Sequence, residues 1–304
     1  MEPLRVIGVD VGGTKTLAAV VTGEGAIEKQ VTYPTDVTSQ DALLAGLDRI
    51  VDETRGGDEI AAVGFGIPSR VDQRSGRAVA SVNIPLADVD FRDRMRERHG
   101  LPVGIDNDAN AATIGEWRAG AAKGARNVVM LTLGTGVGGG LVLNGRPFRG
   151  TTGVGSELGH IVIGRDGPPC GCGGHGHLES YASGRAADRA ARELYGEGAD
   201  GHRLVTRARN GERAALDALA EIGRWLGAGV ASFVNVFEPE LLVIGGGFGS
   251  SAADLLLGPA REVLAREGLE PARDTVKIVL AELGFYAGVI GAGMIAFEAL
   301  GAED

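Results

Sequence analysis

Cysteine, basic charge and long apolar runs are all scarce in this chain of 304 residues. Its 2 cysteines fall in one short motif, so there is no disulfide framework of the secreted kind, and we expect a reducing, cytoplasmic environment. A net charge of -10 and a pI near 5.1 argue against a nucleic-acid or membrane-surface partner, because both favour a basic face. The uncharged, glycine-interrupted stretch at residues 283–297 is shorter than the roughly 20 residues of a membrane span. The first residues do not have the pattern of a signal peptide.

Glycine, in contrast, is abundant, with 51 residues, which is more than twice the usual share of about 7%. The dense runs lie at 12–13, 134–140, 153–176 and 245–249, and such clusters indicate turns where the backbone approaches a ligand. The length favours two domains. No linker rich in proline or serine separates them, so a boundary near residue 120 follows only from an internal repeat.

Apolar strands and helix-periodic segments alternate along the chain, which is typical of an α/β sheet with crossover connections. The expected strands are 4–9, 16–21, 60–67, 103–105, 128–133, 141–143, 241–244 and 276–280. The expected helices are 39–54, 109–120, 214–236, 251–266 and 287–300. The order strand, glycine turn, strand occurs twice, at 4–21 and at 128–143, and indicates two similar halves.

A short cysteine and histidine cluster predicts a metal site. Two thiols and two imidazoles, from His160, Cys170, Cys172 and His177, can close a tetrahedral site around Zn²⁺. His175 is the alternative imidazole. A disulfide between cysteines one residue apart would be strained, because the bridge needs Cα atoms about 4.4–6.8 Å apart. We therefore predict a structural zinc ion that pins this loop.

Three glycine turns predict nucleotide binding. Backbone N–H groups at such turns can cradle phosphate oxygens, while a nearby carboxylate holds Mg²⁺ through water. A glycine turn by itself often does nothing but reverse the chain; three of them in two similar halves predict a nucleotide held in a cleft between domains. The first two turns do not match G-x-x-x-x-G-K-[ST], so a Walker-type role of the lysine is not supported. The predicted nucleotide contacts are Asp10, Gly12, Gly13, Thr14, Lys15, Gly134, Thr135, Gly136, Gly245, Gly246 and Gly247.

Asp106 and Asp108 lie where a strand ends and a helix begins, which is where open α/β sheets bind ligands. An aspartate there can take the proton of a substrate hydroxyl during phosphoryl transfer. Either residue could instead only cap the helix. We assign the base to Asp108 and a cap or surface role to Asp106.

With these motifs the chain resembles the sugar kinases of the ROK family (repressors, open reading frames, kinases), within the actin-like ATPase superfamily. The resemblance covers nearly the whole length and rests on five motifs in family order: Asp10-x-Gly-Gly-Thr14-Lys15, Asn107-Asp108-Ala-Asn110, Gly134-Thr135-Gly136-Val-Gly138-Gly139-Gly140, Glu157-x-Gly-His160 and Cys170-Gly-Cys172-Gly-Gly-x-Gly. It implies an α/β, two-domain, actin-like (ribonuclease H-like) fold. Residues 1–120 plus about 295–304 would form the small domain, and 121–294 the large domain with the zinc loop.

The resemblance also implies ATP-dependent phosphorylation of a hexose at its 6-hydroxyl, with Mg²⁺, Asp108 as the general base and a homodimer or homotetramer as the assembly. Glucose is the expected hexose; mannose, fructose, allose, N-acetylmannosamine and a polyphosphate donor stay open. The implied sugar contacts are Gly66, Asn83, Asn107, Asp108, Glu157, His160 and Glu179. A sugar-sensing repressor is disfavoured, because 5 residues precede Val6 where a DNA-binding module of some 60 residues would be needed.

Two departures from the family stand out. His177 replaces a third cysteine, so we predict a Cys₂His₂ site in place of Cys₃His. Phe285 and Tyr286 stand where the family more often has small or acidic residues, and the sequence gives them no role.

Overall fold

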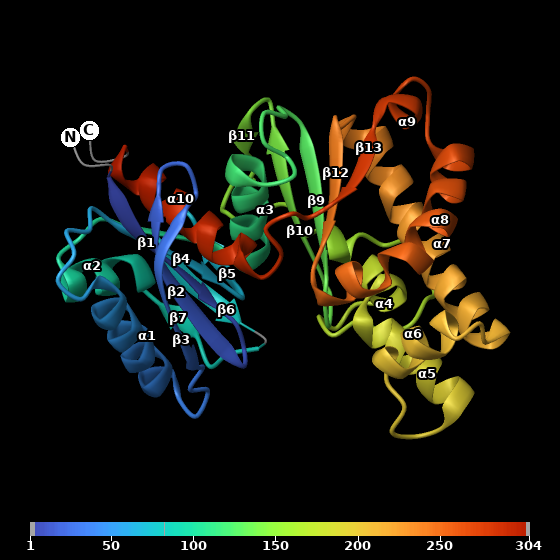
Figure 1. The fold of residues 1–304 in the computed structure, drawn as a ribbon, viewed down its shortest axis with the longest axis horizontal. Coiled ribbons are helices and arrows are strands. Elements are labelled where there is room, and N and C mark those ends of the chain that lie inside the picture. Colours follow the sequence, from blue (N-terminus) through green and yellow to red (C-terminus); the bar gives the residue numbers. More distant parts are fainter. Residues whose placement is uncertain (1–3, 82, 302–304) are drawn as a thin grey trace. The chain divides into compact units, whose positions relative to one another are not determined.

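The computed structural model describes residues 4–81 and 83–301, which form two compact units (Figure 1). Unit 1 comprises Met1–Gly124, Gly140–Ser156 and Glu282–Asp304, and unit 2 comprises Ala125–Gly139 and Glu157–Ala281. Residues 1–3 and 302–304, at the ends of the predicted small domain, lie outside the described residues. The C-terminal return to unit 1 begins earlier than the expected position near 295, because an entire helix packs on the sheet of this unit.

Unit 1 is built on a five-stranded sheet of order β3-β2-β1-β4-β8, in which β1 and β2 form an antiparallel hairpin and β1, β4 and β8 run parallel. Its strands are β1 (Arg5–Val11), β2 (Lys15–Thr22), β3 (Ile27–Pro34), β4 (Val63–Ile67) and β8 (Val103–Asn107). A small sheet contains β5 (Ser69–Asp72), β6 (Arg77–Ser81) and β7 (Ala87–Val89). The helices are α1 (Gln40–Arg55), α2 (Phe91–His99), α3 (Asp108–Ala119) and α10 (Ala287–Leu300), the last preceded by the short 3₁₀ turn η2 (Gly284–Tyr286).

Two cores cover the two faces of this sheet, as the alternation of side chains in a strand requires. Ile7 and Val9 of β1 belong to the core that contains α1 and α2. Val6 of the same strand belongs to the core that contains Ile114 of α3 and Ile290 of α10. Figure 1 shows α10 in red along the sheet, with α1 and α2 on its other side.

A row of glycines lets α10 lie directly on the sheet. Gly8, Gly64 and Gly104 are cross-strand partners on β1, β4 and β8. A Cβ on Gly64 would lie 1.9 Å from the carbonyl oxygen of Ala292, and one on Gly104 would lie 2.5 Å from that of Ile295. Any side chain in this row would push the helix away, so part of the glycine excess serves backbone packing.

A buried carboxylate ties together the places where the chain leaves and re-enters unit 1. Glu116 of α3 is fully buried and accepts hydrogen bonds from the backbone N–H groups of Ala121, Glu282 and Leu283, at 2.8–3.1 Å. Hydrogen bonds to a buried charged acceptor are among the stronger ones. They anchor the segment that leads into α10.

Unit 2 has a central parallel arrangement of β9 (Val128–Leu133), β12 (Leu241–Gly245) and β13 (Lys277–Leu280). The sheet order is β11-β10-β9-β12-β13; β10 (Val137–Leu143) crosses the unit boundary after Gly139, and β11 (Arg146–Pro147) belongs to unit 1. The helical elements are η1 (Leu158–His160), α4 (Leu178–Ala182), α5 (Gly184–Tyr195), α6 (Gly201–Arg209), α7 (Arg213–Phe237), α8 (Gly247–Glu267) and α9 (Ala272–Thr275). The apolar face of α7 packs mainly on α8.

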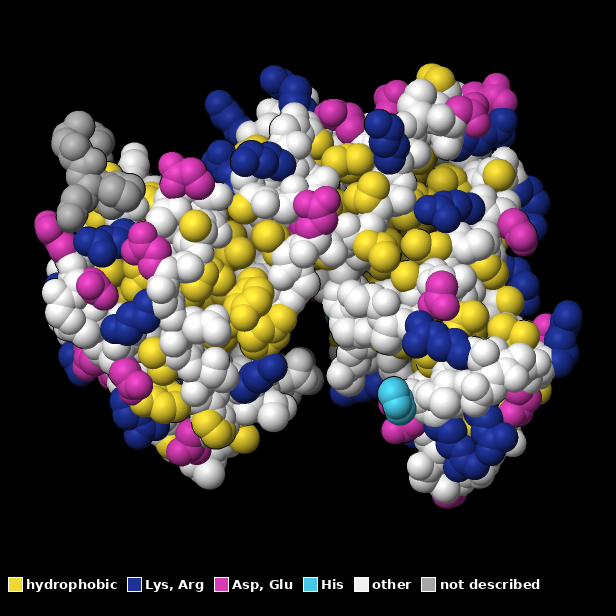
Figure 2. Space-filling model, viewed as in Figure 1, with side chains coloured by type: hydrophobic (Ala, Val, Ile, Leu, Met, Phe, Trp, Pro, Cys, Tyr) yellow, Lys and Arg dark blue, Asp and Glu magenta, His cyan; other side chains and the backbone are white. Residues whose placement is uncertain are grey.

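Every strand and helix that the sequence predicted is present; β9 and α10 have the expected bounds, and the others have shifted ends. The second glycine turn is shorter than expected because β10 already begins at Val137, and α8 begins at Gly247 instead of residue 251. The sequence pattern did not predict β3, β5, β6, β7, β11, α2, α4, α5, α6 or α9. Among the described residues no helix has the length and apolar character to cross a membrane. On the face in Figure 2, side chains of both charges are mixed.

Candidate functional site

The end of β8 carries a buried carboxylate that the sequence analysis misjudged. Asp106 is 0% exposed, so the predicted cap or surface role is wrong. Its Oδ2 accepts a hydrogen bond from Arg149 Nε at 2.5 Å, and its Oδ1 accepts from the backbone N–H of Asn107 and from Asn110 Nδ2. Arg149 also donates to Glu298 at 2.8 Å. A buried carboxylate persists only when paired in this way, and its bonds fix the turn that follows β8.

Asn107 is the true N-cap of α3. Its Oδ1 accepts the backbone N–H groups of Ala109 and Asn110, and its Nδ2 donates to the carbonyl of Ser69. Asp108 is therefore the first residue of the helix, held at the carboxyl end of a parallel strand. Helix N-termini favour negative charge, which suits a carboxylate here.

Asp10 stands at the same edge of the sheet. It pairs in register with Gly66 of β4, which pairs with Asp106 of β8. Burial and the nearby Asp108 carboxylate raise the pKa of Asp10 from 3.8 to about 7, and Lys15 partly opposes that shift. A Cβ on Gly288 would lie 2.6 Å from Cγ of Asp10, so this carboxylate packs against the first turn of α10.

The tip of the β1–β2 hairpin is held from the side by Thr35. Gly12 N–H donates to the carbonyl of Lys15 at 3.0 Å, and Thr35 Oγ1 donates to the carbonyl of Gly12 at 2.7 Å. A Cβ on Gly13 would approach the carbonyl of Asn83 to 3.3 Å. The hairpin tip with Thr14 thus lies beside Asn83. Within unit 1, residues predicted to bind the nucleotide therefore lie close to residues predicted to bind the sugar.

In unit 2 the Glu179 carboxylate joins the second glycine turn to the cysteine loop. Its Oε2 accepts the backbone N–H of Val137 at 3.0 Å, and its Oε1 accepts from Cys170 Sγ at 3.4 Å. A Cβ on Gly136 would lie 2.2 Å from Oε2. Only glycine leaves space for this carboxylate at the turn.

The third glycine turn lies beside the second. Gly246 has a φ of +82°, and a Cβ there would meet the carbonyl oxygen of Leu133 at 2.4 Å. Gly245 pairs with Thr132 of β9, and Gly247 starts α8. Gly134, next to Leu133, accepts the backbone N–H of Gly184 at 2.8 Å, while Thr135 accepts that of Arg185 at 3.3 Å. Unit 2 therefore places its two predicted nucleotide-binding turns side by side.

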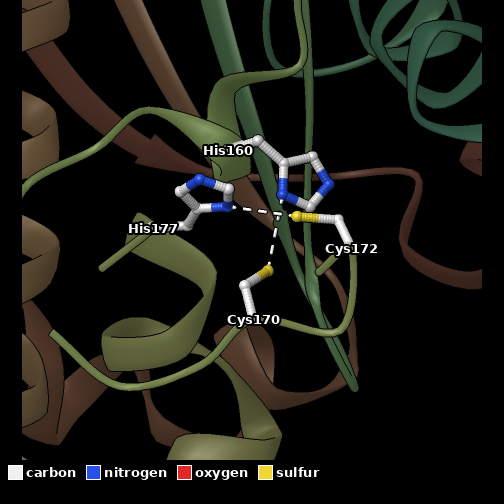
Figure 3. A group of neighbouring side chains, drawn as sticks. All are labelled: His160, Cys170, Cys172 and His177. Carbon is white, nitrogen blue, oxygen red and sulfur yellow. Dashed lines mark hydrogen bonds between the residues drawn. The ribbon is translucent and has the colours of Figure 1, made fainter. Parts of the chain in front are cut away.

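The four predicted metal ligands converge (Figure 3). The ligand atoms of His160, Cys170, Cys172 and His177 all lie within 4.8 Å of one another. The Sγ of Cys170 is 3.6 Å from His160 Nδ1, and the Sγ of Cys172 is 3.3 Å from His177 Nδ1. With Zn–S near 2.3 Å and Zn–N near 2.0–2.1 Å, a tetrahedral ion separates sulfur from nitrogen by about 3.6 Å. This donor set fits zinc, and exposed His175 is not part of it.

The two ring nitrogens of His160 face different groups. Nδ1 faces the thiol of Cys170, while Nε2 is 3.9 Å from Oε2 of Glu157. Neither cysteine forms a disulfide. Burial, together with hydrogen bonding, raises the pKa of the Cys170 thiol to about 11, so a bound cation would have to displace its proton.

Several residues of these clusters have no signal in the sequence. Arg149, Glu298, Thr35 and Glu116 occur outside the motifs and meet them only through the fold. Whether a charged residue is buried depends on the fold, and a single sequence read by itself does not show it.

The chain is similar to known proteins over nearly its whole length. A sequence model described as the ROK family matches residues 6–299. The glucokinase of Streptomyces coelicolor is 38% identical over 313 residues, covering 96% of this chain and 97% of its own. That of Thermotoga maritima is 37% identical over 317 residues, covering 99% and 100%.

Solved structures agree. A ROK family glucokinase from Streptomyces griseus in complex with glucose and AMPPNP has a TM-score of 0.84 and 35% identity, covering 97% of this chain and 99% of that one. The ROK hexokinase of Thermus thermophilus has a TM-score of 0.87 and 34% identity, covering 98% and 100%. The chain therefore has the α/β actin-like ATPase fold and belongs to the ROK family.

Proposed function

We propose that this chain is an ATP-dependent glucokinase, which transfers the terminal phosphoryl group of ATP to the 6-hydroxyl of glucose. The observation that supports this most directly is its near full-length similarity to several glucokinases, together with a similar structure that holds glucose and AMPPNP. The clusters around Asp108 and Glu179 add the chemistry that such a transfer needs.

Asp108 is the proposed general base. It would accept the proton of the 6-hydroxyl as that oxygen attacks phosphorus, a step in which positioning and charge stabilisation supply most of the catalysis. Asp106 supports this role, because its buried pair with Arg149 fixes the backbone from which Asp108 projects. We assign the remaining sugar contacts to Gly66, Asn83, Asn107, Glu157, His160 and Glu179.

The hairpin tip in unit 1 and the paired glycine turns in unit 2 are the proposed donor-binding elements. Backbone N–H groups of Gly12, Gly13, Gly134 and Gly136 would face phosphate oxygens, with the Thr14 and Thr135 hydroxyls and Lys15 beside them. Residues 245–247 are assigned to the adenosine. Mg²⁺ bound with ATP would offset phosphate charge, and Asp10 is the residue assigned to hold it through water.

Turnover with purified protein tests the function. A coupled assay should show glucose as the best substrate in a panel with mannose, fructose, allose and N-acetylmannosamine, and ATP as a better donor than polyphosphate. Asp108→Ala should lower kcat by roughly 10²–10⁴-fold and leave glucose affinity, measured by calorimetry, within a few-fold. Exposed Asp93 on α2 offers the control substitution Asp93→Asn. Near-normal turnover of Asp108→Ala would refute the assignment of the base.

We also propose that His160, Cys170, Cys172 and His177 hold a structural zinc ion. Elemental analysis of gently prepared protein should give one zinc per chain. His177→Ala should lose the metal to a chelator much faster than His175→Ala, which removes the exposed neighbour. Fully active protein without zinc would contradict this proposal.

The compartment and assembly follow from the proposed activity. A glucokinase draws on cellular ATP, and the two unpaired thiols suit the reducing cytoplasm. A homodimer or homotetramer is proposed from the family resemblance, and sedimentation can test it. The apolar face of α7 gives no independent support, because that face is used in packing on α8.

A further inference from the structure

The aromatic pair at residues 285 and 286 lies beside the β1–β2 tip. Both rings belong to the segment η2 that leads into α10, and they are 48% and 38% exposed. The Nζ of Lys15 lies 3.8 Å from the centre of the Phe285 ring. Tyr286 packs edge-on against Phe285, with ring centres 5.4 Å apart and planes at 67°. The Lys15 ammonium and the Phe285 ring therefore form a cation–π contact, and Tyr286 packs against the edge of this pair.

This is the one close side-chain contact of the Lys15 ammonium within residues 4–81 and 83–301; the Asp10 carboxylate, whose pKa Lys15 lowers, interacts with it at longer range. An ammonium above an aromatic face is attracted by the ring quadrupole. The ring carries no charge and takes no conventional hydrogen bond, so the lysine keeps its full positive charge and its three N–H donors. A carboxylate at the same distance would neutralise the charge and occupy the donors.

We propose that Phe285 is a positioning residue for the phosphoryl donor, holding the Lys15 ammonium in place at the hairpin tip while leaving its charge available to phosphate. This inference rests on the proposed function. It gives a physical reason for an aromatic residue at a position where the resembled family more often has small or acidic ones. Because the contact involves the donor side of the site, it acts on ATP binding and not on glucose binding.

Three substitutions separate this role from simple packing. Phe285→Leu keeps an apolar side chain but removes the ring, and should raise the KM for ATP about 2–5-fold, the factor that matches an exposed cation–π contact. Phe285→Asp supplies the ion-pair partner and should raise the KM for ATP further, by about 10-fold or more. Phe285→Trp should restore wild-type behaviour, since tryptophan is the strongest cation–π partner. The KM for glucose should stay unchanged in all three variants.

The effect must also depend on the lysine. In a Lys15→Met background, Phe285→Leu should change the KM for ATP by less than a factor of about 1.5, because the contact is already lost and the effects of two residues in contact do not add. Arg49→Met, which removes the cation above Tyr33 elsewhere in unit 1, is the matched control and should leave the KM for ATP unchanged. Melting temperatures of all variants establish that they are folded.

The proposal is overturned if Phe285→Asp binds ATP as tightly as the wild type, if the loss falls on glucose, or if Phe285→Leu acts equally without Lys15. Calorimetry with AMPPNP measures the same differences without turnover. An inactive wild type that still binds AMPPNP through Lys15 and Phe285 would contradict the proposed function alone, so the two failures are distinguishable.

Discussion

Asp10→Asn should make the ligand-free protein more stable at neutral pH. Burial and the Asp108 carboxylate raise the pKa of Asp10 to about 7, whereas its ordinary value is 3.8. The folded protein therefore binds this proton more tightly than the unfolded chain does. Between about pH 4 and 7 the folded state holds more protons, so the free energy of unfolding falls as the pH rises through this window. Asparagine carries no proton to lose and does not show the effect.

The magnitude follows from the two pKa values. A difference of 7 − 3.8, about 3 units, corresponds to about 4 kcal/mol at about 1.36 kcal/mol per unit. This is an upper value, because the N-terminus of α10 beside Gly288 favours the ionised carboxylate. The stability of Asp10→Asn should thus exceed that of the wild type by less than about 1 kcal/mol at pH 4 and by up to about 4 kcal/mol at pH 8.

Urea unfolding of both proteins between pH 4 and pH 8.5, without nucleotide or sugar, measures this difference directly, and titrating groups that do not interact with Asp10 cancel in the subtraction. In an Asp108→Asn background the pH-dependent gain should shrink, because one of the two causes of the raised pKa is gone. The same Asp10→Asn protein should lose most of its kinase activity. A stability gain that is flat with pH, or that grows towards acid, would refute the reasoning.

Two further predictions concern packing in unit 1. Gly64→Ala should destabilise the protein by about 1–3 kcal/mol, since its Cβ would clash with the backbone of α10. Gly46→Ala on α1 has open space around the new Cβ and should stabilise the protein by about 0.5–1 kcal/mol. Thermal unfolding compares the two variants, and equal effects would contradict the close approach of α10 to the sheet. Asp106→Asn should lower the free energy of unfolding by on the order of 3 kcal/mol, because Arg149 is left half-paired. Adding Arg149→Met to this variant should recover part of that loss, measured by urea unfolding. A double variant less stable than Asp106→Asn alone would argue against a buried pair.

The spacing of residues along the sequence was sufficient to predict an element wherever the segment has a strong pattern of its own. The helix α1 shows apolar residues at helical spacing after Ser39, whose hydroxyl does accept the N–H of Ala42 as its cap. Asn-Gly is a preferred sequence for a two-residue hairpin turn, and Asn144 and Gly145 both have the positive φ values that such a turn requires. The cluster of potential metal ligands was predicted for the same reason, because four donors within 18 positions can come together independently of the rest of the fold.

Elements with a weak pattern were missed. The helix α2 is mostly charged, and only Phe91, Met95 and His99 are buried, each four residues from the next. One buried residue per turn gives too little periodicity to distinguish a helix from a polar loop. The helix α5 buries three alanines, which give an equally weak signal.

The sequence by itself determined most strands of the two main sheets, the long helices, the cysteine and histidine cluster and the family. Only the tertiary structure decided what the charged residues between the motifs do. Asp106 meets Arg149 across 43 positions, and Lys15 meets Phe285 across most of the chain. Such pairs depend on strand register and on where α10 lies on its row of glycines, and these are set by the packing of the whole unit and not by any local stretch of sequence.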